Sequence, residues 1–145
     1  MLLITIGLIG LGYLTIGRSY LRKLATDPLT GLFNEHSVVA KIKNVKAPIH
    51  GKINALALFD VANFTAVNSE CGYKVGELAL KQIAECLKQV TRERDIIGRV
   101  GAEQFIVCLV NIEDEVAQEL FSRVQKALAD VSFKVGSGGK VDIHS

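Results

Sequence analysis

The spacing of apolar and polar residues changes several times along the chain, and each change predicts a different element. An uncharged segment rich in Leu, Ile and Gly covers residues 1–17, and a polar, basic stretch follows over 18–26. Apolar residues at helical spacing predict four helices, over 35–45, 64–70, 75–91 and 113–130. Short β-rich runs predict strands over 55–60, 95–98, 106–110, 131–135 and 141–143. This order of elements is typical of an α+β domain with helices packed on a sheet.

Two of the predicted strands carry acidic residues where they end. The run from Ala55 to Asp60 is continuously apolar up to its last residue, which predicts a strand covered on both faces. The runs 95–98 and 106–110 are joined by a short Gly-containing segment, which predicts a β-hairpin with Glu103 at its tip. A carboxylate on such a turn can bind a metal ion or act as a base. The alternative is a solvated residue on a turn that Gly101 shapes.

The N-terminal segment predicts a membrane anchor. Its 17 uncharged residues are at the short end of a span, which usually needs ~20, but Tyr20 and Leu21 extend it while Arg18 reaches the interface. Basic residues directly after it predict a single-pass helix in the inner (cytoplasmic) membrane, with the domain facing the cytoplasm. A signal peptide fits less well, because a charged start and a small-residue cleavage site are missing. The last helix of a longer sensor is a third interpretation.

Composition narrows the class of protein further. The 145 residues are enough for one ordinary domain, and the mean hydropathy of +0.30 reflects the apolar N-terminal segment. The net charge is +2 and the basic residues are scattered, so we expect no nucleic-acid partner. Cys71, Cys86 and Cys108 show no C-x-x-C spacing, which is typical of buried, reduced thiols in a cytosolic domain.

Four stretches in order resemble one known family. Asp27–Asn34 reads DPLTGLFN, Asp60–Asn68 reads DVANFTAVN, Gly72–Glu77 places its Gly and acidic residues at family spacing, and Gly101–Phe105 reads GAEQF. These stretches resemble the GGDEF domain, the diguanylate cyclase fold related to class III nucleotide cyclases. The resemblance covers residues 27–145, a domain that ends at Ser145 before the family's last strands and closing helix.

The resemblance implies a reaction, in which two GTP molecules condense to cyclic di-GMP with the help of Mg²⁺ or Mn²⁺, usually in a homodimer. It implies that Asp60, Val61 and Glu103 are the metal ligands. It places the catalytic acids at Glu103 and at position 104, where this chain has Gln104. It assigns nucleotide contacts to six further residues: Phe64, Thr65, Asn68, Glu77, Gly101 and Ala102.

Several of these positions depart from the family pattern. Ala102 replaces a Gly, Gln104 replaces an acid, and Thr65 replaces a phosphate-binding Lys. Because deleting one such contact typically costs ~10²–10³ in rate, the departures predict a domain that does not make cyclic di-GMP. It would instead bind GTP or cyclic di-GMP as a regulatory module. The retained Asp60 and Glu103 favour the alternative of a weakly active cyclase.

A second site is implied after the helix over 75–91. Arg92 and Asp95 form the R-x-x-D pattern of the family's inhibitory site for cyclic di-GMP. Arg pairs well with phosphate, and Asp accepts hydrogen bonds from a guanine edge. The alternative for these two residues is a salt bridge at the end of a helix. For the whole domain, the second alternative to a nucleotide-binding module is a ligand-free dimerisation or partner-binding module.

Overall fold

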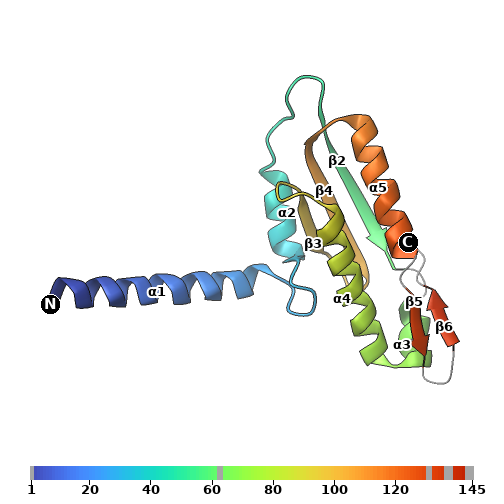
Figure 1. Cartoon of the computed structure of the whole chain (residues 1–145), viewed down its shortest axis with the longest axis horizontal. Coiled ribbons are helices and arrows are strands. Elements are labelled where there is room, and N and C mark those ends of the chain that lie inside the picture. Colours follow the sequence, from blue (N-terminus) through green and yellow to red (C-terminus); the bar gives the residue numbers. More distant parts are fainter. Residues whose placement is uncertain (1, 62–63, 130–131, 136–138, 143–145) are drawn as a thin grey trace.

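The computed structural model describes residues 2–61, 64–129, 132–135 and 139–142 (Figure 1). Its helices are α1 (Leu2–Ala25), α2 (Glu35–Lys43), α3 (Phe64–Cys71), α4 (Tyr73–Val90) and α5 (Asp114–Ala129). Its strands are β1 (Phe33–Asn34), β2 (Ile53–Asp60), β3 (Ile96–Arg99), β4 (Gln104–Ile112), β5 (Ser132–Val135) and β6 (Gly139–Asp142). The predicted order of helices and strands is confirmed, with β1 as an added short strand.

A four-stranded mixed sheet organises the domain. Its strand order is β1-β3-β4-β2, with β3 and β2 antiparallel to β4 and β1 parallel to β3. The predicted hairpin is confirmed, because Arg99 lies opposite Phe105 and the chain turns between them. Strands β5 and β6 form a separate two-stranded ribbon, while the predicted strand residues Val131 and Ile143 lie outside the described residues.

Helices α4 and α5 bury one face of the sheet. Phe105, Val107 and Leu109 of β4 are fully buried and belong to the same core as Ile83, Leu87 and Val124 of the two helices. Helix α2 covers the opposite face, since Val38 packs on Gly98 whereas the preceding residue of β3 faces the main core. These two layers confirm the predicted α+β class.

The prediction that β2 is covered on both faces is wrong. Leu56 and Leu58 are 58% and 61% exposed, whereas Phe59 is 7% exposed. Side chains alternate along a strand, so Leu56 and Leu58 lie on the face opposite the main core, where α2 packs mainly on β1 and β3. Apolar residues at helical spacing are not all buried either, because Leu78 of α4 and Val116 of α5 are 54% and 43% exposed.

Close packing of α2 on β3 depends on Gly98. A Cβ atom there would lie 2.6 Å from Val38 Cβ and 2.9 Å from the carbonyl oxygen of Phe33. We therefore expect Gly98→Ala to lower the free energy of unfolding by about 1–3 kcal/mol, measured by denaturant unfolding. Gly101→Ala is the control, because its nearest contacts would all be to the Gln104 side chain, the closest being the flexible side-chain oxygen at 3.1 Å. An equal loss in the two variants would contradict the packing explanation.

Helix α1 is continuous through the predicted linker and its described side chains are mostly exposed. Residues 4–25 form one helix long and apolar enough to cross a membrane, and no part of it is buried in the domain. Its C-terminal end is held by Asn34, whose side-chain amide donates to the carbonyl oxygen of Leu24 at 2.8 Å. The other side-chain oxygen of Asn34 accepts from Ser37 N and so caps α2. Asn34 thus connects α1 to the first helix of the domain.

Candidate functional site

The end of β2 and the hairpin turn meet at one edge of the sheet. Asp60 lies directly opposite Gln104 in the register of β2 and β4. The next residue, Val61, donates its backbone N–H to the carbonyl oxygen of Glu103 at 3.0 Å. Antiparallel pairing therefore brings together the backbones of residues that are more than forty positions apart, and with them four predicted metal or catalytic positions.

Gln104 makes a direct contact with the predicted metal ligand Asp60. Its side-chain amide donates to one carboxylate oxygen of Asp60 at 3.1 Å. An acid at position 104 would instead repel Asp60, and the pair would need a cation between the two carboxylates. The amide removes that need, because a neutral donor satisfies the carboxylate by itself. With Gln104 in place of an acid, a hydrogen bond stabilises the Asp60 carboxylate where a metal ion would otherwise be needed.

The acidic residues predicted to bind metal are two, Asp60 and Glu103. Among the described residues there is no group of three or more His, Cys, Asp or Glu side chains that could hold a metal. Asp60 and Glu103 provide two carboxylates next to the backbone of Val61, and Mg²⁺ is commonly held by one or two carboxylates together with substrate phosphates. An ion here would therefore depend on a bound nucleotide to complete its ligands.

The hairpin turn is supported by Arg99, a residue that sequence reasoning missed. One guanidinium nitrogen lies 3.2 Å from both carboxylate oxygens of Asp27, and another donates to the carbonyl oxygen of Ala102 at 2.6 Å. Asp27 also accepts from the backbone and hydroxyl of Thr30, at 2.8 and 2.7 Å. Arg99 thus links the turn after α1 to the hairpin turn. The signal that could have revealed this pair is the opposite charge of Asp27, which opens one quoted motif, and Arg99, which lies two residues before another.

Electrostatics at Asp27 agree with this geometry. Burial alone would raise the pKa of Asp27, but the hydrogen bonds from Thr30 and the charge of Arg99 outweigh it and hold the pKa below its ordinary value. Both side chains are largely buried, with exposures of 17% for Asp27 and 15% for Arg99. Asp27 is therefore an ionised structural anchor for the turn.

The predicted nucleotide contacts are spread over α3, α4 and the turn. Thr65, Glu77, Gly101 and Ala102 are exposed, whereas the Phe64 side chain is buried in the core. Residues 62–63, part of the predicted phosphate-binding turn, lie outside the described residues. The structure therefore leaves four of these six side-chain positions open to solvent.

Asn68, the remaining nucleotide position, lies against Gly76 of α4. A Cβ at Gly76 would be 2.0 Å from the side-chain oxygen of Asn68, so only Gly allows α3 and α4 to approach here. That oxygen is buried and has no hydrogen-bond partner among the described residues. A buried acceptor without a partner costs about 1–3 kcal/mol, so the Asn68 oxygen is an acceptor that a bound donor would satisfy.

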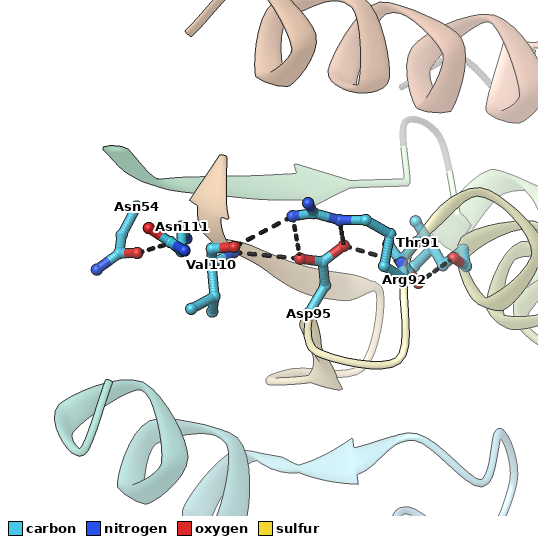
Figure 2. Close-up of polar contacts among 7 residues, drawn as sticks. Asn54, Thr91, Arg92, Asp95, Val110 and Asn111 are labelled. Carbon is cyan, nitrogen blue, oxygen red and sulfur yellow. Dashed lines mark hydrogen bonds and ion pairs between the residues drawn. The ribbon is translucent and has the colours of Figure 1, made fainter. Parts of the chain in front are cut away.

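Arg92 and Asp95 form a compact ion pair at the end of α4 (Figure 2). The Arg92 guanidinium donates to both Asp95 oxygens, at 2.7 and 3.0 Å, and to the carbonyl oxygen of Val110 at 3.2 Å. Asp95 also accepts from the backbone N–H groups of Arg92 and Val110, at 2.8 and 3.1 Å. The Asp95 carboxylate is fully buried and has four donors, as the salt-bridge alternative predicts.

Asp95 and Arg92 differ in their surroundings, since Asp95 is buried and Arg92 is partly exposed. Burial would raise the pKa of Asp95, but the hydrogen bonds from Arg92 and Val110 and the Arg92 charge hold that pKa below its ordinary value. The Arg92 side chain is one-third exposed, at 33%. With Lys52 and Arg94 it lines a cavity of about 180 Å³, which Glu113 also borders. The cluster is therefore a structural ion pair with a basic outer side.

Sequence comparison gives one family for most of the chain. Residues 24–144 match the family described as diguanylate cyclase, GGDEF domain. The chain is 34% identical over 114 residues to the diguanylate cyclase DgcP of Pseudomonas aeruginosa, covering 77% of this chain and 17% of that protein. It is 30% identical over 106 residues to the diguanylate cyclase DgcP of Escherichia coli, covering 71% and 31%. The chain thus spans less than a third of either relative's length.

Solved structures agree with the sequence comparison. The diguanylate cyclase SiaD of Pseudomonas aeruginosa, in complex with its activator SiaC, is 27% identical with a TM-score of 0.74, covering 98% of this chain and 56% of that one. The coiled coil and GGDEF domain of DgcB from Caulobacter crescentus, in complex with c-di-GMP, gives a TM-score of 0.83 at 17% identity, covering 97% and 76%. At that identity the second likeness shows the fold alone.

Proposed function

The chain belongs to the diguanylate cyclase GGDEF-domain family of cyclic di-GMP signalling, and we propose that this member binds cyclic di-GMP without synthesising it. The proposal has two parts, the loss of catalysis at the sheet edge and binding at the Arg92 cluster. Each part depends on different residues, so each can fail separately.

The contact between Gln104 and Asp60 carries the first part of the proposal. Joining a ribose hydroxyl to an α-phosphate needs divalent metal to neutralise phosphate charge and activate the hydroxyl. Asp60, Glu103 and the Val61 carbonyl would hold one ion when nucleotide is bound, and that ion supplies Lewis-acid chemistry. Gln104 adds no charge and occupies one Asp60 oxygen at 3.1 Å. Thr65 and Ala102 weaken phosphate binding further, since one has no charge and the other adds a methyl group.

The basic outer side of the Arg92 cluster supports the second part. Cyclic di-GMP carries two phosphates and two guanines, and Arg can pair with the first and stack on the second. Arg92, Arg94 and Lys52 surround one cavity, so three cations can face a ligand with two negative charges. Asp95 holds the Arg92 backbone and guanidinium in place, and in this proposal it acts as the support rather than as a ligand.

A membrane anchor completes the proposal. The described residues of helix α1 are mostly exposed, and residues 4–25 are long and apolar enough to span a bilayer. Basic residues at its C-terminal end favour a domain on the cytoplasmic side. The homodimer that the family resemblance implies stays a prediction.

Calorimetry with cyclic di-GMP tests the binding part. We expect a dissociation constant in the micromolar range, which corresponds to about 8 kcal/mol. Arg92→Ala removes a charge-assisted phosphate contact and should weaken binding by about 1.5–3 kcal/mol. Lys81→Ala is the control, because this exposed cation of α4 does not line the cavity, and we expect it to leave binding nearly unchanged.

Two other functions are outcomes of these measurements. Equal binding by wild type and Arg92→Ala would show that the ligand lies elsewhere, with the nucleotide site around Asn68 as the next candidate. No binding at all would favour a ligand-free scaffold, which the four donors already engaged by Asp95 also favour. Cyclic di-GMP formed from GTP would identify a weakly active cyclase.

A further inference from the structure

Charge is unevenly distributed between the part of the chain next to α1 and the rest of the domain. Residues 18–52 contain seven Lys or Arg and two acids, whereas residues 53–145 contain ten Lys or Arg and thirteen acids. The basic part comprises the end of α1, the whole of α2 and the connection to β2. A basic surface beside a helix of membrane-spanning length points to a negatively charged partner near the membrane.

The fold places α2 at the level where the apolar part of α1 ends. In Figure 1, α2 lies on the side of the domain nearest to α1. Thr15 and Arg18 of α1 line a groove of about 570 Å³ together with Lys41 of α2. The uncharged segment of α1 ends at Gly17, so Lys41 lies beside the predicted boundary between hydrocarbon and headgroups.

Two sides of α2 carry cations that are available to a partner, Lys41 on the side near α1 and Lys43 on the outer side. Lys41 and Lys43 are exposed, and His36, Val39 and Lys43 line a shallow groove that Glu35 also borders. In the described part of the chain, Lys88, Arg92 and Arg99 make the ion pairs, and neither α2 lysine takes part. Lys41 lies 4.5 Å from the centre of the Phe33 ring, which directs its ammonium group without neutralising it.

From this arrangement we propose that α2 rests on anionic lipid headgroups of the membrane in which α1 is anchored. The inference depends on the proposed membrane anchor, because α1 sets the height of α2 above the bilayer. Each Lys near an anionic surface strengthens association roughly fivefold. Lys41 beside Arg18 and Lys43 on the outer side of α2 are together enough to bias the domain toward one orientation on the membrane.

A Trp probe on α2 can measure this contact, because the chain contains no Trp. Val39 is 38% exposed on the outer side of α2, so Val39→Trp is expected to be tolerated. The full chain with this probe is placed in nanodiscs of phosphatidylcholine, with or without phosphatidylglycerol, containing brominated acyl chains. We expect strong quenching of the fluorescence in the anionic discs and weak quenching in the neutral discs. Adding Lys41→Gln and Lys43→Gln should lower the ratio of docked to undocked domain about 25-fold.

A matched pair of substitutions controls for charge alone. Lys74→Gln with Lys81→Gln removes the same charge from exposed positions on α4 and should leave the quenching unchanged. Equal quenching in neutral and anionic discs, or in all charge variants, would overturn the proposed headgroup contact. No quenching in either disc would also overturn it while leaving the anchor intact. A chain that enters neither kind of disc would refute the anchor itself.

Discussion

Replacing Asp95 with Ala is expected to lower the free energy of unfolding by about 3–5 kcal/mol. The change removes a fully buried carboxylate and leaves the Arg92 guanidinium and the Val110 N–H without their acceptor. Both donors are partly buried, so water replaces the lost hydrogen bonds poorly. Denaturant unfolding of the wild type and Asp95→Ala measures the difference.

The same comparison has a defined pH dependence. The folded-state pKa of Asp95 is below its ordinary value, so the stabilisation is fully present above the unfolded-state pKa of ~3.9. It is lost as the pH falls through the folded-state value, and the two proteins should then converge in stability. Glu93→Ala is the control, because this neighbouring acid is exposed and should change stability by ~0.5 kcal/mol or less. A loss of that size for Asp95→Ala would mean that the pair is not a structural anchor.

Replacing Gln104 with Glu is expected to tighten Mn²⁺ binding roughly 30-fold. Opposite charges 4 Å apart attract by about 1 kcal/mol in water, so an added carboxylate contributes about twice that beside a divalent ion. The substitution also removes the amide that donates to Asp60 at 3.1 Å and frees that oxygen for metal. Titration with Mn²⁺, followed by the electron paramagnetic resonance signal of the free ion, measures the affinity.

A control separates this local effect from a change in net charge. Gln89→Glu makes the same substitution at an exposed position of α4 and should leave Mn²⁺ affinity within about twofold of the wild type. If Gln104→Glu binds Mn²⁺ no better than Gln89→Glu, the Gln104 amide is not what limits metal binding at Asp60.

The sequence predicted the elements whose periodicity is strong. The pattern over 75–91 and the Gly-containing turn before Phe105 led to α4 and to the hairpin, and both are confirmed. Continuous apolar sequence in β2 was less informative, because it does not show which face has a helix over it. Leu56 and Leu58 are exposed for that reason, although they are as apolar as their buried neighbours.

The sequence patterns could not predict contacts between side chains that are far apart in the chain. The motifs brought Asp60 and Glu103 to one site, but the contact of Gln104 with Asp60 depends on a register that only the paired strands define. The link from Arg99 to Asp27 and Ala102 likewise needs β1, the turn after α1 and the hairpin in their final positions. In contrast, Arg92 and Asp95 are close in sequence. A salt bridge between them was one of the two interpretations of the R-x-x-D pattern.

The central claim, that this family member does not synthesise cyclic di-GMP, is tested most directly by product formation from GTP. The full chain in nanodiscs is incubated with GTP and either Mg²⁺ or Mn²⁺, and the nucleotides are separated and quantified. We expect no more product from the wild type than from Glu103→Ala, because Gln104 and Thr65 each remove a contact worth ~10²–10³ in rate. Cyclic di-GMP that accumulates with the wild type and disappears with Glu103→Ala would contradict the claim and identify an active cyclase.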